Sequence, residues 1–220
     1  EVYRKMALSR KLDDKMLILL KQGKSFFHIG ASGHEGAQLA AAGMIKPGED
    51  WSFPYYRDGA YCLGLGMTAR EQLLSFLAKA ADPNSGGRQM PQHYGHKDLR
   101  IVSQSSPTGT QFLQAVGCAM VCKMEKTKEV VYVSAGEGTT SQGDFHEALN
   151  WASNAKAPVI FHIQDNEYAI STHRSEQTAS SIYDITSGYG NLSRYDVDGT
   201  DFFETSLAFK EAVQRARRDK

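Results

Sequence analysis

The sequence predicts an α/β fold in which a parallel sheet carries helices on both faces. Two runs, 129–134 and 158–163, are apolar and rich in β-branched residues, which is typical of buried strands. Helical patterns lie between and after the strands, and this alternation favours a parallel sheet with right-handed crossovers. Residues 195–198 are expected to form a third strand. Since the chain has 220 residues, we expect one domain over 1–220.

The helices are predicted from apolar spacing and from capping residues. Apolar side chains recur at helical spacing from residue 2 until Gly23 ends the pattern. Thr68 and Glu71 form a capping box, and Asp201 with Glu204 repeats this spacing before the last helix. The expected helices are 2–22, 34–44, one that begins at Thr68, 109–124, 144–154 and one that begins at Asp201. Residues 136–143 are expected to form a turn.

Residues 82–106 show no helix or strand period and contain several glycines and prolines. A loop of this length inside a compact domain is usually functional or disordered. Because the segment is also rich in Met, His and Tyr, we predict a functional loop and not a flexible linker.

Composition excludes several classes of protein. Lys plus Arg and Asp plus Glu both total 25, so the chain lacks the basic excess typical of nucleic-acid or anionic-membrane binding. No apolar run approaches the roughly 18 residues that would suggest a membrane span, and the first residues lack a signal-peptide core. Cys62, Cys118 and Cys122 form no CxxC pair and are expected to be buried thiols in a reducing compartment. We therefore predict a cytoplasmic location, or the mitochondrial matrix in a eukaryote.

Residues suited to bind an anion and a metal ion follow the first two predicted strands. Gly136-Glu137-Gly138 follows the first and precedes a helix, so its backbone is suited to approach a bulky anion. Glu137 would repel a diphosphate unless a cation lay between them. Asn166, after the second strand, offers an amide oxygen, and ligands of parallel sheets bind at the carboxyl ends of the strands. Together with phosphate oxygens, these groups suit Mg²⁺.

Each half of this pattern alone is weak, because a GxG turn and an asparagine after a strand are common. Their joint placement on successive strands is more specific. The spacing resembles the thiamine diphosphate fingerprint, GDG followed some thirty residues later by NN. The sequence of residues 136–147, together with Tyr168-Ala-Ile-Ser-Thr172, is similar to that of the alpha subunit of 2-oxo acid dehydrogenases. Residues 87–95 and 105–111 resemble the branched-chain (2-oxoisovalerate) type of this subunit.

The resemblance implies a thiamine diphosphate-binding fold and assigns roles to individual residues. It implies that Mg²⁺ is bound by the Glu137 and Asn166 side chains and the Tyr168 carbonyl, and that the substrate pocket contains His93 as the catalytic candidate. The implied cofactor-binding residues are Tyr56, Arg57, Ser106, Thr108, Gly136, Glu137, Gly138, Thr139, Asn166 and Tyr168. The implied pocket residues are Phe27, Tyr56, Met90 and His93, and a K⁺ site is implied at Ser105, Pro107, Thr110 and Gln111. Without the resemblance, Arg57 is a surface charge, Met90 and His93 are loop residues, and 105–111 is an ordinary turn.

Two positions depart from the family pattern. The magnesium carboxylate is Glu137 where Asp is commoner, which keeps the chemistry. Gln164 stands where relatives often carry an arginine to the diphosphate, and an amide cannot supply that charge. We expect either weaker cofactor binding or another cation in its place.

The expected function is the diphosphate- and Mg²⁺-binding half of an enzyme that oxidatively decarboxylates a branched-chain 2-oxo acid. The acyl group would pass to lipoyl on an acyltransferase component, and a beta subunit or beta half would carry the activating glutamate in an alpha2beta2 assembly. We expect a fragment truncated at its C-terminus, inactive alone, because the family's later His loop lies past Lys220. The alternatives are a pyruvate or acetoin dehydrogenase alpha subunit, or an inactive excised module that only binds. A nicotinamide-binding Rossmann domain is disfavoured, since no G-x-G-x-x-G opens a helix after the first strand.

Overall fold

The predicted parallel sheet is present in the computed structural model, which describes residues 1–218. Its three strands lie in the order β1 (Trp51–Phe53), β2 (Val131–Gly136) and β3 (Val159–Gln164), and all pairs are parallel. The register sets Gly136 beside Gln164, so the carboxyl ends of β2 and β3 lie together at one edge of the sheet.

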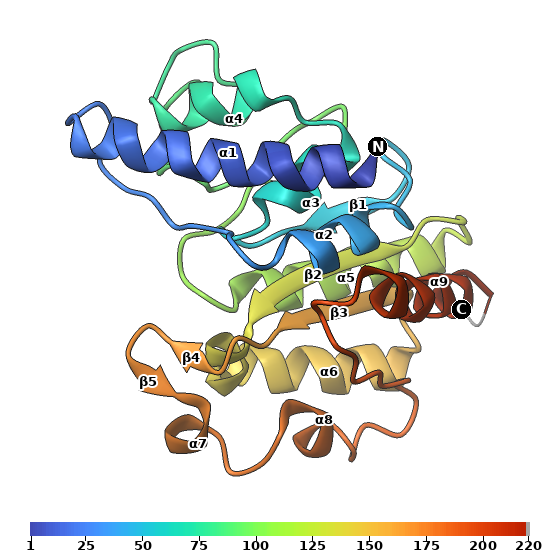
Figure 1. The fold of residues 1–220 in the computed structure, drawn as a ribbon. Coiled ribbons are helices and arrows are strands. Elements are labelled where there is room, and N and C mark those ends of the chain that lie inside the picture. The colour runs from blue at the N-terminus through green and yellow to red at the C-terminus, as the bar shows by residue number, and fades with distance from the viewer. Residues whose placement is uncertain (219–220) are drawn as a thin grey trace.

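Helices cover both faces of this sheet (Figure 1). The α-helices are α1 (Val2–Lys21), α2 (Glu35–Ala42), α3 (Gly59–Leu65), α4 (Ala69–Phe76), α5 (Thr110–Met124), α6 (Gly143–Ala155), α7 (Arg174–Gln177), α8 (Ile182–Ile185) and α9 (Phe202–Arg218). A 3₁₀ helix, η1 (Glu137–Ser141), follows β2, and a small antiparallel pair, β4 (Tyr168–Ala169) and β5 (Thr172–His173), follows β3.

The central strand divides its side chains between two cores. Because successive side chains of a strand point to opposite faces, Val131 and Val133 pack against α5 and α6, where Phe112 and Phe145 are fully buried. Tyr132 packs on the other face, against α2, α3 and α9. Both faces of β2 are thus buried, which explains why its sequence is apolar without alternation. Helix α1 forms an outer layer on α2, α3 and α4.

Several predicted elements are confirmed. Helices α1, α2, α5 and α6 lie within two residues of the predicted bounds, and the capping box at Thr68 and Glu71 is formed. The cap at Asp201 is half formed. Its carboxylate accepts from the backbone N–H of Glu204 at 3.1 Å, but the Glu204 carboxylate accepts from Asp198 N–H at 3.4 Å and not from Asp201.

Two expectations about elements were wrong, and one strand was not predicted. Residues 195–198 are extended but pair with no strand in the described part of the chain, because they lie across a groove from β3. The segment after Gly136 is the 3₁₀ helix η1 and not an open turn, and Thr140 Oγ1 donates to Glu137 O at 2.7 Å within it. Strand β1 was missed, since three residues between loops carry no periodic signal.

The predicted loop 82–106 is confirmed as irregular backbone, although it is well anchored. Ser52 N–H donates to Arg100 O at 3.0 Å and Val102 N–H donates to Ser52 O at 2.9 Å, so the end of the loop pairs with β1. Among residues 1–218, no helix is long and apolar enough to cross a bilayer. The three cysteines are free; Cys62 and Cys122 are buried, and Cys118 is half-buried.

Candidate functional site

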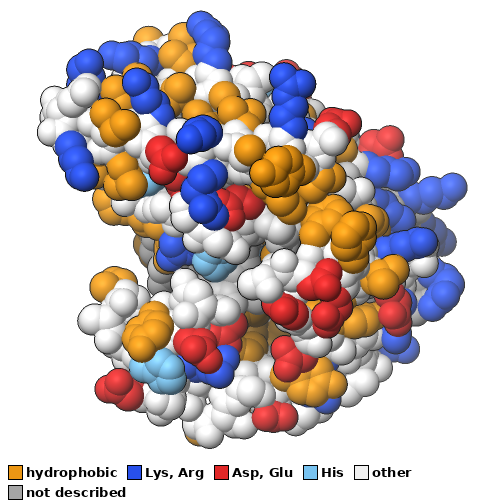
Figure 2. Space-filling view, in the orientation of Figure 1, with side chains coloured by type: hydrophobic (Ala, Val, Ile, Leu, Met, Phe, Trp, Pro, Cys, Tyr) orange, Lys and Arg blue, Asp and Glu red, His pale blue; other side chains and the backbone are white. Residues whose placement is uncertain are grey.

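The predicted site residues gather where β2 and β3 end. Glu137 follows Gly136 at the start of η1, and Asn166 lies two residues beyond the last residue of β3. The two segments touch, since Asn166 N–H donates to Glu137 Oε2 at 3.4 Å. Figure 2 shows a notch on this side of the molecule, between the part that contains α1 and α4 and the part that contains β4 and β5.

Glu137 is buried and incompletely satisfied. Only 3% of the residue is exposed, and its Oε1 has no hydrogen-bond partner. Burial raises the pKa of the Glu137 carboxyl and the charge of Asp165 adds to this, while Arg57 opposes it. An unpartnered buried carboxylate oxygen is costly. The arrangement therefore suits a cation, which would satisfy that oxygen and favour the charged carboxylate.

The segment after β3 turns sharply at this point. Asn166 Oδ1 accepts from Tyr168 N–H at 3.0 Å, and Glu167 adopts a left-handed φ of 68°. Arg174 forms ion pairs with Asp165 and Glu167, which hold the turn from outside. The structure therefore brings Asn166 next to Glu137, as their placement on successive strands predicted. The Asn166 amide oxygen is engaged within its own turn.

Close packing explains why the second glycine of the motif, Gly138, is required. A Cβ on Gly138 would lie 2.6 Å from the Ala169 Cβ, whereas a Cβ on Gly136 would meet nothing closer than Tyr55 Cε2 at 3.8 Å. Gln177 Nε2 also donates to Gly138 O at 2.6 Å. Gly138 is thus required so that η1 and β4 can approach, while the structure gives Gly136 no such steric requirement.

Arg57 lies at the same edge, after β1. Its Nη1 donates to Gly30 O at 2.6 Å, and its guanidinium lies over the Tyr56 ring at 5.7 Å. It forms no ion pair with any residue in 1–218, although its charge opposes the raised pKa of Glu137 and adds to the effect of burial, which lowers the pKa of His34. A half-buried guanidinium with unused donors is suited to a phosphate.

A buried polar network centred on Asp58 adjoins these groups, and the sequence analysis did not predict it. The Asp58 carboxylate accepts from Gln164 Nε2 at 2.6 Å and from the Ser134 hydroxyl, and Ser134 Oγ accepts from Tyr55 N–H at 3.2 Å. Burial raises the pKa of Asp58 to about 7, although these donors oppose the shift. The network joins the segment after β1 to both β2 and β3.

Gln164 is committed to this network. Besides its bond to Asp58, its Oε1 accepts from Gln38 Nε2 at 3.0 Å and lies 3.1 Å from His34 Nδ1. The side chain is buried. Its contacts with Gln38 and His34 link α2 and the residue before it to β3. The sequence did carry one signal of this network: Gln38 is a long polar residue inside the alanine-rich helix α2.

The segment 105–111 lines a small polar cavity together with Tyr55, Tyr56 and Thr139. Tyr55 OH and Gln104 Oε1 are buried there without hydrogen-bond partners. Three of the four predicted K⁺ ligands already form hydrogen bonds: Thr110 Oγ1 donates to Pro107 O at 2.9 Å, and Gln111 Oε1 accepts from Gly109 N–H at 3.2 Å. The predicted residues Ser105, Ser106 and Thr108 all face this cavity.

His93 is buried beside this cavity. Its Nε2 lies 3.1 Å from Ser106 Oγ, and its Nδ1 lies 3.2 Å from Pro91 O. Since a carbonyl oxygen only accepts, Nδ1 carries the proton in a neutral ring and Nε2 accepts from the serine hydroxyl. Met90 Sδ is 3.9 Å from the same hydroxyl and the residue is partly exposed. Phe27 is half-buried in the segment that precedes α2.

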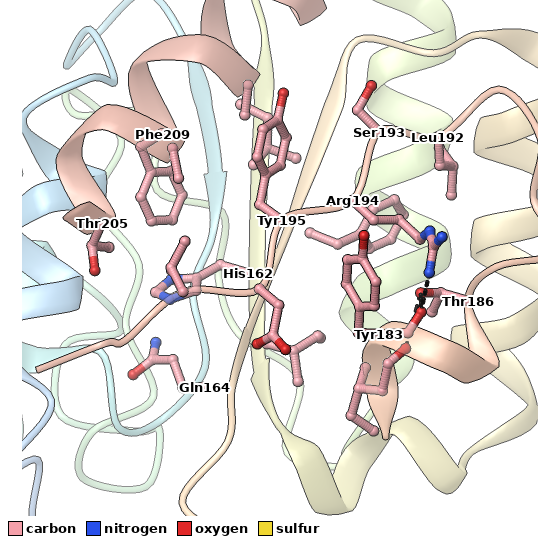
Figure 3. A pocket seen from close by; sticks show the side chains of 18 of the residues that line it. His162, Gln164, Tyr183, Thr186, Leu192, Ser193, Arg194, Tyr195, Thr205 and Phe209 are labelled. Carbon is pink, nitrogen blue, oxygen red and sulfur yellow. Dashed lines mark hydrogen bonds between the residues drawn. The ribbon is translucent and has the colours of Figure 1, made fainter. Parts of the chain in front are cut away.

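A large groove lies next to this site. A groove of about 1060 Å³ is bounded by β3, α9 and residues 182–200, and it reaches His34, Gln164 and Asn166 at one end. Figure 3 shows Tyr195 on the side of the groove opposite His162. Its size does not make it the better cofactor site, since the unpartnered Glu137 oxygen and Arg57 lie at the strand ends.

Comparison with known proteins identifies the family. The family model described as "Dehydrogenase E1 component" matches residues 3–220. The chain is 48% identical over 219 residues to the 2-oxoisovalerate dehydrogenase subunit alpha of Bacillus subtilis, which covers 99% of this chain and 66% of that protein. It is 37% identical over 223 residues to the mitochondrial subunit alpha of Homo sapiens, with 98% and 48% covered. The corresponding Arabidopsis thaliana subunit alpha 1 is 36% identical over 216 residues, with 98% and 44% covered. The chain thus spans between about half and two thirds of these relatives, and it belongs to the dehydrogenase E1 component family.

Proposed function

We propose that this chain forms the diphosphate- and magnesium-binding half of a thiamine diphosphate-dependent 2-oxo acid dehydrogenase of the branched-chain type. The observation that carries the proposal is the buried Glu137 carboxylate, whose unpartnered Oε1 lies where β2 ends and where β3 brings Asn166 alongside. Family membership implies thiamine diphosphate, and that cofactor when bound supplies the electron sink for decarboxylation.

The residues present fit the cofactor's charged end. Glu137, Asn166 and the Tyr168 carbonyl provide the oxygen ligands that Mg²⁺ prefers. Arg57 offers donors to phosphate oxygens, with Tyr56 stacked beside it. Thr139, within η1, borders the adjoining cavity. Arg57 and the cation together offset the negative charges of Glu137 and the diphosphate.

A second cation is proposed at 105–111. Tyr55 OH and Gln104 Oε1 are buried oxygens without partners, and they face the same cavity as Ser105 and Gln111. A set of neutral oxygens without a carboxylate suits a monovalent ion such as K⁺. Its role here would be to order the loop that carries Ser106 and Thr108, which the family resemblance sets beside the cofactor.

The substrate is proposed to be a branched aliphatic 2-oxo acid, bound among Phe27, Tyr56, Met90 and His93. The relatives are named 2-oxoisovalerate dehydrogenase, which supports this class over pyruvate or acetoin as the substrate. The His93 Nε2 accepts a hydrogen bond from Ser106 Oγ, so this side chain is suited to orient a group that displaces that hydroxyl, or to take a proton from it.

The remaining machinery is proposed to come from other parts of the assembly. A beta subunit or beta half would supply the activating glutamate, and a lipoyl-bearing acyltransferase would accept the acyl group, in an alpha2beta2 enzyme. A cytoplasmic location, or the mitochondrial matrix in a eukaryote, stays a prediction, as does the single truncated domain over 1–220.

Calorimetry tests the cofactor proposal directly. The full-length protein with its beta partner is titrated with thiamine diphosphate in the presence of Mg²⁺. We expect Glu137→Gln to weaken binding by at least about tenfold, because the amide removes the charge that favours the cation. Glu147→Gln, an exposed carboxylate on α6, is the matched control and should change nothing. No binding by the unmodified assembly would refute the proposal and favour an inactive interaction module.

Substrate class requires a separate measurement. With the assembly loaded, decarboxylation of 2-oxoisovalerate should exceed that of pyruvate in kcat/KM. A preference for pyruvate would leave the cofactor site intact but assign the chain to the pyruvate or acetoin type.

A further inference from the structure

The segment 25–33, called here the Gly30 segment, has no helix or strand, yet it is fixed to four different parts of the molecule. At its ends, Ser25 Oγ donates to Phe76 O at 2.7 Å, and Gly33 N–H donates to Glu35 Oε2 at 2.8 Å. Its centre is held by two long-range side chains, Asp13 and Gln92. Neither of these is among the residues assigned to the cofactor or substrate.

Asp13 anchors the segment from α1. It is buried in the middle of the helix, and its Oδ2 accepts from Ala31 N–H at 2.7 Å and from Ser32 Oγ at 3.3 Å. Its Oδ1 lies 3.7 Å from His28 Nε2. A carboxylate buried on a helix is unfavourable unless it is hydrogen-bonded. These contacts satisfy that need, and all of them are made to the Gly30 segment.

Gln92 anchors the same segment at Ile29, two residues before the Asp13 contact at Ala31. Its amide contacts both backbone groups of Ile29: Oε1 accepts from Ile29 N–H, and Nε2 donates to Ile29 O at 2.5 Å. Gln92 is buried and adopts a left-handed φ of 62°, directly before His93. This two-point contact therefore ties the loop that carries His93 to the Gly30 segment.

Gly30 lies between the two anchored residues, Ile29 and Ala31. Its carbonyl accepts the 2.6 Å hydrogen bond from Arg57 Nη1. A free arginine side chain loses much rotamer entropy when it binds an anion. A carbonyl held rigidly in place fixes one end of the guanidinium before binding and leaves other N–H groups directed outward, which reduces that loss.

We propose that Asp13 and Gln92 are positioning residues for diphosphate binding. They fix the Gly30 carbonyl, the carbonyl orients Arg57, and Arg57 binds the diphosphate. The inference rests on the proposed function. It adds that affinity for the diphosphate depends on two side chains that do not touch it, and that Gln92 couples this end of the site to the loop of His93.

A double-mutant cycle distinguishes positioning from general stability. The probe is thiamine diphosphate with Mg²⁺, titrated by calorimetry into the full-length protein with its beta partner. We expect Asp13→Ala and Gln92→Met each to weaken binding by about tenfold, which corresponds to the typical cost of losing about one hydrogen bond. In an Arg57→Ala background, the same changes should weaken binding by less than about twofold, because the guanidinium that they orient is absent.

Two further variants keep the result interpretable. Asp14→Ala changes the exposed neighbour of Asp13 on the same helix and should leave affinity unchanged. Asp13→Asn retains an acceptor for Ala31 N–H and should recover most of the affinity, which decides the matter if Asp13→Ala does not fold.

The outcomes separate the two proposals. If the unmodified assembly binds no thiamine diphosphate, the proposed function fails and this inference fails with it. If it binds, and the Asp13 and Gln92 changes either have no effect or weaken binding equally with and without Arg57, the function stands and the positioning role is overturned.

Discussion

Asp58 gives a prediction that depends on the structure alone. The carboxyl is fully buried, and burial raises its pKa to about 7 from an unfolded value near 3.8. The folded protein therefore holds a proton between these two pH values that the unfolded chain has released. Because the folded state binds more protons, stability falls as pH rises through this window. The penalty is complete above about pH 7 and absent below about pH 4.

The magnitude follows from the pKa difference. Each pH unit within the window changes the free energy of unfolding by about 1.4 kcal/mol. Between pH 5 and pH 8 the Asp58 carboxyl should therefore reduce stability by about 2.5 kcal/mol. Asp58→Asn removes this titration while keeping an acceptor for Gln164 Nε2, which lies 2.6 Å from Oδ1. Its stability relative to the unmodified protein should increase by that amount over the same range.

Urea unfolding at several pH values measures this difference. Other groups titrate in the same range, so the quantity of interest is the unmodified protein minus Asp58→Asn at each pH, in which those groups cancel. Asp14→Asn, which changes an exposed carboxylate, controls for net charge. A difference that is constant from pH 5 to pH 8, or that changes in the opposite direction, would refute the assignment of Asp58 as a buried, protonatable carboxyl.

Three further predictions use other sites. Gly138→Ala should destabilise the protein by about 1–3 kcal/mol in urea unfolding, because its Cβ would lie 2.6 Å from that of Ala169, while Gly136→Ala should change little; equal costs would contradict the packing argument. Burial lowers the pKa of His162 to about 3, so stability should fall as pH drops below about 6.5, by at most about 2 kcal/mol at pH 5, and His162→Gln should lack that loss in acid unfolding. Burial raises the pKa of Cys118 to about 12, so its labelling by iodoacetamide at pH 8 should be far slower than that of a free thiol, and a comparable rate would contradict this.

Much of the fold was predictable because its signals are local. The apolar runs before residues 136 and 164, the caps at Thr68 and Asp201 and the spacing of the first helix all act within a few residues. Strand β1 was not predicted, and residues 195–198 were predicted wrongly, for the same reason. A three-residue strand is defined by its neighbours, Val130 and Ile101, and an extended segment forms a strand only where a partner is present.

The site was predictable only in part. The turns at Glu137 and Asn166 follow from sequence spacing on adjacent strands. The residues that support them do not, because Asp13, Asp58 and Gln92 lie far from those turns in sequence and carry no motif of their own. Only the folded chain brings Asp13 to the Gly30 segment or Gln92 to Ile29.

Gln164 shows how the structure changes the meaning of a sequence departure. At the sequence level, the absence of an arginine here was a loss of charge for the diphosphate. In the structure, the Gln164 amide donates to the buried Asp58 while its oxygen lies within reach of the buried Gln38 and the half-buried His34, so it contacts three polar groups at once. An arginine would have no acceptor for Gln38 and would convert Asp58 into half of a buried ion pair. With a neutral residue at 164, Arg57 is the guanidinium at this edge that forms no ion pair within residues 1–218. More of the diphosphate affinity should then depend on Arg57, which is a physical reason for its carbonyl partner to be anchored from both sides.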